Sequence, residues 1–193
     1  MKKNTITYFI LIGLSLTLLS FEIPAGWSKA GSEPNSYDMG IEKGAGMNGK
    51  NAATVKSIAN NIVGFGTLMQ YSSAEKFLGK RIRLSGYVKT KDVVKKSCFW
   101  LRVERTNSQI SLAFDNMQDR PIVGTTDWKK YEIVLDVPSN ATKISYGGLL
   151  KGTGQIWFYN LAFEIVDNSI PTTGRKNEKT TVNAEPFNLD FDK

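Results

Sequence analysis

The sequence predicts an all-β domain in which antiparallel strands form a sandwich or a barrel. Short apolar or alternating runs recur along the chain, separated by Gly, Asn, Asp or Pro, which is typical of such folds. No stretch after residue 25 shows the long apolar period of about 3.6 residues that indicates a helix. The 193 residues, 41% hydrophobic and 11% aromatic, are enough for one domain with its own core.

The first twenty residues predict a secretory signal peptide. Met1-Lys2-Lys3 is a basic start, and residues 8–19 form an apolar run that is shorter than the ~20 residues of a membrane span. We therefore expect removal of residues 1–20, export to the periplasm or the extracellular space, and no stable membrane anchor afterwards. The alternative is a buried N-terminal helix.

Composition excludes several classes of function. The chain has no His and a single Cys, Cys98. Ser-His-Asp catalysis, Cys-His catalysis and His-based zinc sites are therefore excluded, and Cys98 has no partner for an intramolecular disulfide. The net charge of +7 is spread along the chain instead of forming one patch, so we expect no nucleic-acid partner.

The expected strands are the alternating or apolar runs that lie between turn residues. In chain order they are residues 37–43, 51–58, 64–71, 80–90, 97–105, 109–115, 129–137, 142–150 and 155–166. Residues 73–78 are expected to form a helical turn that ends at Gly79. Gly152 and Gly154 mark a tight hairpin before the last strand.

Alternation is clearest in two of these runs. In 80–90, Ile82, Leu84 and Val88 face one way, while charged and polar side chains face the other. Residues 129–137 alternate in the same way. A period of two over this length predicts half-buried antiparallel strands.

The domain is expected to span residues 21–167, followed by a polar, mobile C-terminal tail at 168–193. The tail ends in Leu189-Asp190-Phe191-Asp192, which is similar to Leu19-Ser20-Phe21-Glu22. This similarity is chance, the first strand of a second copy of the domain, or an extra strand that docks on a sheet. An added strand would allow a protein partner to bind through the tail.

Several motifs occur in an order that resembles a known family. They are FEIPAGW (21–27), GKRIRLSGYVKT (79–90), GTTDWKKYEIVLDVP (124–138) and LLKGTGQIWFYNLAFEIV (149–166). This order resembles the galactose-binding-like jelly roll of the non-catalytic carbohydrate-binding modules of glycan-active enzymes. Residues 112–128 are similar to a bacterial subfamily of unassigned activity. The resemblance implies an antiparallel β-sandwich of the jelly-roll type, with about 8–10 strands, and carbohydrate binding without catalysis.

The resemblance also bears on metal binding. In such modules the last strand often carries paired aspartates that help to hold a structural calcium, and the matching positions here are Tyr159 and Asn160. Glu22 and Asn160 remain as candidate oxygen ligands, but without the two acids we expect no cofactor.

The first candidate ligand site lies on the strand at 97–105. Phe99, Leu101 and Val103 suit the core. The residues of the opposite face are Cys98, Trp100, Arg102 and Glu104, and Tyr87 on the strand before extends this row. An indole stacks on a sugar ring while Arg and Glu bind hydroxyls, so an open row of this kind suits a sugar. The alternative is that a loop covers Trp100 and that Arg102 pairs with Glu104.

The second candidate is the polar turn at 114–121. Its donors and acceptors are Asp115, Asn116, Gln118, Asp119 and Arg120. Such a turn suits ligand binding, and it equally suits a turn that satisfies its own backbone. Asp115 and Asp119 also allow a third interpretation, as the acid and base of a glycoside hydrolase.

The remaining tryptophans, Trp27, Trp128 and Trp157, are expected in the core. Cys98 shares the face of Trp100, so an open face predicts slow labelling of the native thiol by a maleimide. The leading hypothesis is an exported, non-catalytic module that binds carbohydrate or a similar polyhydroxylated ligand. The alternative is a structural or protein-interaction module of the envelope, and a hydrolase is third.

Overall fold

The computed structural model describes residues 20–108 and 110–174. The expected signal peptide, apart from Ser20, and the Leu189–Asp192 motif lie outside these residues. No helix of the described segments has the length and apolar character needed to cross a membrane.

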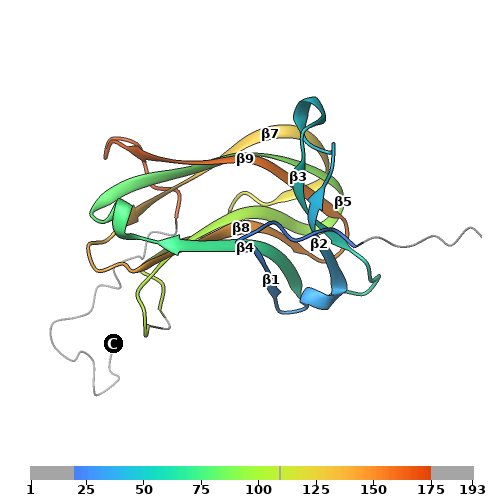
Figure 1. Ribbon diagram of the computed structural model, residues 1–193, viewed down its shortest axis with the longest axis horizontal. Coiled ribbons are helices and arrows are strands. Elements are labelled where there is room, and N and C mark those ends of the chain that lie inside the picture. The colour runs from blue at the N-terminus through green and yellow to red at the C-terminus, as the bar shows by residue number, and fades with distance from the viewer. Residues whose placement is uncertain (1–19, 109, 175–193) are drawn as a thin grey trace, which may run out of the picture.

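Antiparallel strands form two packed layers, which confirms the predicted all-β sandwich (Figure 1). The described strands are β1 (Ser28–Gly31), β2 (Tyr37–Glu42), β3 (Ala52–Ser57), β4 (Phe65–Ser73), β5 (Lys80–Glu104), β6 (Ala113–Asp115), β7 (Ile122–Val137), β8 (Lys143–Lys151) and β9 (Gln155–Val166). One layer has the order β7-β5-β9-β3-β2, and the other has the order β6-β5-β8-β4-β1. Three short 3₁₀ turns connect strands: η1 (Pro34–Ser36), η2 (Met47–Gly49) and η3 (Glu75–Phe77).

Strand β5 belongs to both layers. Residues 81–91 pair with β9, and residues 96–104 pair with β8. Between them the register with β7 shifts three times, and Asp92 adopts a positive φ of 52°. Such irregularities bend a strand and carry it from one sheet to the other.

The continuity of β5 corrects the prediction of two separate strands at 80–90 and 97–105. The segment between them stays paired with β7, because Val93 lies opposite Gly124 and Ser97 lies opposite Ile122. For the same reason β7 begins at Ile122 instead of residue 129.

Three other elements differ from expectation. The strand expected at 109–115 is reduced to β6, and β1 was not predicted because its sequence SKAG has no apolar alternation. The helical turn expected at 73–78 is the shorter η3, and Gly79 after it has a φ of +68°. This left-handed conformation is easily adopted by glycine, as the sequence predicted.

The core lies between the layers and follows the predicted alternation. Fully buried side chains come from both halves of β5 and from the strands beside and opposite them: Leu68, Ile82, Leu84, Val88, Phe99, Leu101, Val103, Ile144, Leu150, Ile156 and Phe158. Trp27 packs against Tyr146 and Phe158, as expected for a core residue.

The segment at 168–174 packs on the sandwich, in contrast to the mobile tail expected after residue 167. The backbone N–H of Thr173 donates to the Val134 carbonyl, and the Val134 N–H donates to Thr173 Oγ1 at 2.9 Å. The guanidinium of Arg81 donates to the carbonyls of Asn168 and Ile170. These contacts cover Val134, which is buried although it lies on the outward side of β7.

Candidate ligand-binding site

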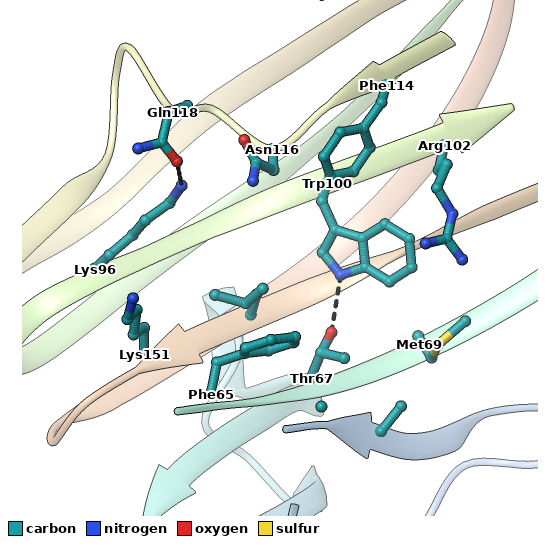
Figure 2. Close-up of a pocket in the computed structure, with 13 residues that line it drawn as sticks. Phe65, Thr67, Met69, Lys96, Trp100, Arg102, Phe114, Asn116, Gln118 and Lys151 are labelled. Atoms are coloured by element: carbon teal, nitrogen blue, oxygen red, sulfur yellow. Dashed lines mark hydrogen bonds between the residues drawn. The ribbon is translucent and has the colours of Figure 1, made fainter. Parts of the chain in front are cut away.

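A pocket of about 490 Å³ lies on the outward face of the β6-β5-β8-β4-β1 layer (Figure 2). Its lining residues are Ala30, Gly31, Phe65, Thr67, Met69, Lys96, Trp100, Arg102, Phe114, Asn116, Gln118, Leu149 and Lys151. Side chains of one face of a strand recur at every second position, which explains why Phe65, Thr67 and Met69 appear together. Regular strands therefore hold most of the wall in place.

Trp100 is fixed across the sheet and is only 6% exposed. Its indole N–H donates to Thr67 Oγ1 at 2.8 Å, although β8 lies between the two strands. The residue opposite Trp100 on β8 is Gly147, which carries no side chain to block the ring. The Thr67 hydroxyl in turn donates to the Gly148 carbonyl at 2.8 Å.

This burial corrects the expectation of an open row on 97–105. The Arg102 guanidinium carbon lies 5.7 Å from the centre of the indole ring, and Phe114 lies beside the ring in the same pocket (Figure 2). Trp100 therefore contributes to the pocket wall, and no extended flat platform is formed.

Cys98 is completely buried, which also contradicts an open face. Met117 of the 114–121 turn is also completely buried, and Asp115 and Arg120 of that turn lie close enough to Cys98 to affect the pKa of its thiol. Burial raises the pKa of the Cys98 thiol to about 12.

Glu104 stabilises the fold instead of lining the pocket. Its carboxylate pairs with Arg102 at 3.1 Å and Lys143 at 3.3 Å and accepts a hydrogen bond from Ser145 Oγ at 2.6 Å. Burial alone would raise the pKa of Glu104, but the Ser145 hydrogen bond and the two cations lower it overall. The Arg102–Glu104 pair that the sequence allowed as an alternative is therefore formed, and Arg102 also lines the pocket.

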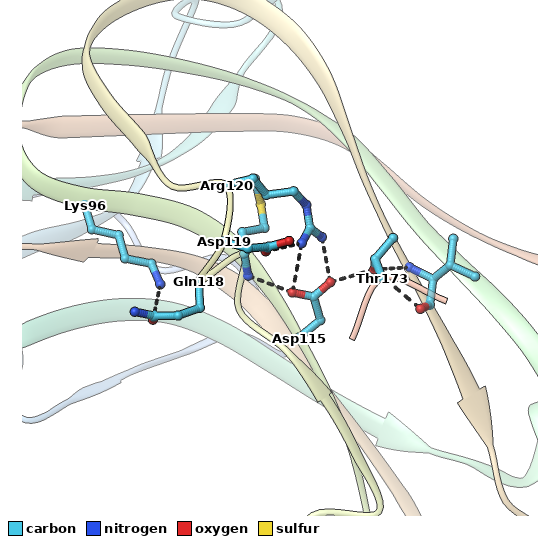
Figure 3. Close-up of polar contacts among 8 residues, drawn as sticks. Lys96, Asp115, Gln118, Asp119, Arg120 and Thr173 are labelled. Atoms are coloured by element: carbon cyan, nitrogen blue, oxygen red, sulfur yellow. Dashed lines mark hydrogen bonds and ion pairs between the residues drawn. The ribbon is translucent and has the colours of Figure 1, made fainter. Parts of the chain in front are cut away.

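Three residues of the polar turn bind one another (Figure 3). Asp115, 4% exposed, accepts hydrogen bonds from the Met117 N–H at 2.7 Å, Arg120 at 2.6 Å and Thr173 Oγ1 at 2.6 Å. Arg120 also pairs with Asp119 at 2.8 Å. For Asp115, Asp119 and Arg120 the structure therefore has the self-satisfied turn that the sequence left as an alternative.

The other two turn residues, Asn116 and Gln118, face the pocket. Gln118 Oε1 accepts a hydrogen bond from Lys96 Nζ at 3.0 Å (Figures 2 and 3). The structure thus brings together four of the predicted ligand residues, and these are Trp100, Arg102, Asn116 and Gln118.

Tyr87 does not extend this site, because it lies on the part of β5 that belongs to the other layer. There it is opposite Lys130 and Tyr159. The passage of β5 between the layers separates Tyr87 from Trp100, which the sequence alone did not indicate.

Two tryptophans expected in the core lie on the outward face of that other layer. Lys89 Nζ lies 4.7 Å from the centre of the Trp157 ring and 5.2 Å from that of Trp128. Trp157 is 8% exposed and donates from Nε1 to Glu42 at 2.7 Å, while Trp128 is half-buried against Tyr159. Each is covered by polar or aromatic neighbours on the outside of the sheet instead of by the core.

The candidate calcium ligands lie on different elements. Glu22 forms an isolated bridge to Ile41, and Asn160 is an exposed residue of β9 with a φ of 55°. Within residues 20–108 and 110–174 there is no group of three or more His, Cys, Asp or Glu side chains suited to hold a metal ion.

Most of the apolar wall was not predicted as a site. Phe65, Met69 and Leu149 lie on strands that the sequence did predict, at 64–71 and 142–150. Alternation in these strands identifies their outward side chains, but it does not show that these strands lie beside Trp100.

Comparison with solved structures defines the class of fold. No family model matches the chain. The CBM22-1 xylan-binding domain of Paenibacillus barcinonensis Xyn10C is similar, with a TM-score of 0.52, 12% identity, and coverage of 75% of this chain and 88% of that one. The CBM22-1–GH10 modules of Clostridium thermocellum Xyn10B, solved with xylohexaose, are similar with a TM-score of 0.53 and 13% identity; the match covers 72% of this chain and 26% of that one. The enzymatically active domain of bacteriophage CBA120 tailspike protein 4 is similar with a TM-score of 0.54 and 12% identity; the match covers 74% of this chain and 20% of that one. The chain thus has the jelly-roll fold of carbohydrate-binding modules, as the sequence motifs implied.

A relative found by sequence is named as a transcriptional regulator and not as a carbohydrate-binding module. The chain is 43% identical over 168 residues to the uncharacterized HTH-type transcriptional regulator YbfP of Bacillus subtilis (strain 168). The match covers 86% of this chain and 56% of the relative, so the chain spans about half the length of the curated relative it matches.

Proposed function

We propose that this domain is an exported, non-catalytic module that binds a carbohydrate or a similar polyhydroxylated ligand in the Trp100 pocket. The observation that carries the proposal is the pocket itself, which combines an immobilised indole with the polar ends of Arg102, Asn116 and Gln118. Sugar sites need both features, because one face of a pyranose is apolar while its hydroxyls need hydrogen-bond partners.

The architecture supports a site formed before the ligand arrives. Phe65, Met69 and Leu149 project from regular strands, and the turn that carries Asn116 and Gln118 is fixed through Asp115. Little side-chain freedom is then lost on binding, which favours affinity for a small ligand. Proteins of similar fold that are described as xylan-binding, or as binding ligands in a cleft, support carbohydrate binding as the function.

The hydrolase hypothesis has less support. Asp115 and Asp119 both pair with Arg120. The pKa of Asp119 is lowered by its own backbone N–H and by Arg120, whereas a general acid needs a raised pKa. The two carboxylates therefore suit a structural turn better than acid–base chemistry.

The match to a regulator supports a second candidate, in which the same pocket senses a soluble sugar instead of attaching the protein to a polymer. Affinity for mono- or disaccharides that does not increase with chain length would favour sensing. Affinity that increases with chain length would favour attachment. A protein-interaction module of the envelope remains the alternative for a pocket that binds no sugar.

Binding of the purified protein to a glycan array, followed by calorimetry on the hits, tests the proposal. We expect Trp100→Ala and Gln118→Ala to weaken binding at least about tenfold, whereas Trp128→Ala on the other layer leaves it unchanged. Gln118 is a surface residue of the turn, so its substitution keeps the test valid if Trp100→Ala does not fold. No binding to any glycan by the folded parent protein contradicts the proposal.

A further inference from the structure

The charge of the Trp100 pocket has one sign. Lys96, Arg102 and Lys151 line it, and no Asp or Glu does. Glu104 pairs with Arg102 and Lys143, but it is not part of the pocket lining. A pocket of this kind raises the local concentration of anions.

Two of these cations occupy paired positions on neighbouring strands. Lys96 on β5 and Lys151 on β8 are partners in the antiparallel register, at one end of the pocket (Figure 2). Like charges in this position destabilise a sheet, because the side chains of opposite residues lie close together. Within residues 20–108 and 110–174 neither lysine forms an ion pair, and the hydrogen-bond acceptor of Lys96 is the neutral amide of Gln118.

The arrangement is exceptional within this sandwich. The other register partners of the described strands in which both residues are charged have opposite signs: Asp38–Lys56, Arg81–Asp136, Arg83–Glu164 and Glu104–Lys143. Among the described strands the single like-charge pair of register partners therefore lies at the pocket, where an anion would compensate the repulsion.

The third cation lies at the other end of the indole (Figure 2). Arg102 uses Nη2 for Glu104, but its buried Nε has no hydrogen-bond partner among the described residues. Lys96 and Arg102 are six positions apart on β5, which is about 20 Å of extended chain. This spacing suits a saccharide of several units better than a single small anion.

We propose that the ligand of the Trp100 pocket is an anionic saccharide, with an acidic group held between Lys96 and Lys151. The inference rests on the proposed function and names its ligand class. The acidic group is the carboxylate of a uronic acid or a sulfate ester, since both present oxygen acceptors to two ammonium groups. A sugar ring then contacts Trp100 and the apolar wall, and Arg102 binds the next part of the chain.

Calorimetry with three sets of oligosaccharides of equal length tests this assignment. The probes are oligogalacturonate for the carboxylate, heparin-derived oligosaccharide for the sulfate, and neutral xylo-oligosaccharide. We expect one acidic probe to bind at least about tenfold more tightly than the neutral one at 50 mM NaCl, with the difference reduced at 500 mM. The acidic probe that binds more tightly identifies the group.

Matched variants locate the effect. Lys96→Gln/Lys151→Gln removes two charges from the pocket and is expected to abolish the preference for the acidic probe. Lys50→Gln/Lys76→Gln removes two exposed charges outside the pocket lining and is expected to retain it. Thermal unfolding controls for folding, and loss of the like-charge pair should leave the midpoint unchanged or raise it.

The outcomes separate this inference from the proposed function. Equal affinity for neutral and acidic probes overturns the anionic ligand and leaves sugar binding intact. Equal loss in both double variants shows attraction to the general positive charge and also overturns it. Failure of every probe, on a protein that also binds nothing on the array, overturns both proposals.

Discussion

At the scale of single residues, Thr67 determines how Trp100 is held. Its hydroxyl accepts from the buried indole N–H and donates to the Gly148 carbonyl, so one side chain satisfies two buried groups. A buried N–H left without a partner costs about 1–3 kcal/mol. Thr67→Val, which keeps the shape, should lower the free energy of unfolding by this amount in urea titrations.

The same change should weaken ligand binding, because the indole loses its fixed orientation. Thr67→Ser retains the hydroxyl and serves as the control, with only a small loss expected. If Thr67→Val is as stable as Thr67→Ser, then the hydrogen bond to Trp100 does not carry the stability assigned to it.

Cys98 gives a second prediction at this scale. A completely buried thiol with a pKa raised to about 12 has almost no thiolate at pH 8, so a maleimide should not modify the native protein. Mass spectrometry after incubation with and without guanidinium measures the labelling. Modification under native conditions at a rate typical of exposed thiols would contradict the burial described here and favour the open face that the sequence suggested.

Glu104 makes the stability of the protein depend on pH. Because its pKa is lowered in the folded protein, its contribution to stability is present above the ordinary value of 4.5 and is lost as pH falls through the lowered value. Unfolding measured at pH 7 and pH 3 should show a smaller change for Glu104→Gln than for the parent. An identical pH dependence of the two proteins would show that the pairing with Arg102, Lys143 and Ser145 does not stabilise the charged form.

At the scale of elements, the segment at 168–174 is part of the domain. Thr173 forms hydrogen bonds with Val134 of β7 and with Asp115 of the pocket turn. Arg81 donates to the carbonyls of Asn168 and Ile170. A chain that ends at residue 167 should therefore be less stable than one that ends at residue 174, by about 2 kcal/mol or more.

Comparison of these two truncations isolates the segment, since both lack residues 175–193. Chemical denaturation measures the difference, and hydrogen exchange should show faster exchange at the 115–120 turn in the shorter chain. Thr173→Val in the longer chain, with Thr172→Val as control, distinguishes the hydrogen bonds from the rest of the segment. Equal stability of the two truncations would return the domain boundary to residue 167.

Strands were predicted where the pattern is local. The alternation of Ile82, Leu84 and Val88 depends only on neighbours in sequence, and the structure buries all three. The continuity of β5 was not predictable in this way, because Asp92 and Lys95-Lys96 are typical of a turn. Pairing of Val93 and Ser97 with β7 carries the strand through this segment, although Asp92 itself has a positive φ.

At the scale of the whole molecule, the site depends on residues that are distant in the sequence. The alternation correctly placed the side chains of Trp100 and Phe99 on different faces of the strand. Thr67 and Phe114 lie beside Trp100 only because of the order of strands in the layer. Tyr87 was wrongly assigned to the site, because β5 passes from one layer to the other between Tyr87 and Trp100. Sequence patterns therefore indicated which side chains share one face of a strand. Which strands lie beside one another, and so which faces form the pocket, followed only from the topology.

The pairing of β8 and β9 also determines when the molecule can fold. β8 joins β4 to β5, and β9 joins β3 to β5, so each layer is joined only by one of the last two strands. Ribosomes add about 5–20 residues per second. Before β8 is made, β1 can pair with β4, β2 with β3, and β5 with β6 and β7, but β4 and β3 are not yet joined to β5. Until residue 166 has emerged, the apolar side chains of the earlier strands have no completed core and are accessible to chaperones. The order of strands thus delays completion of both layers until the last two strands have been synthesised.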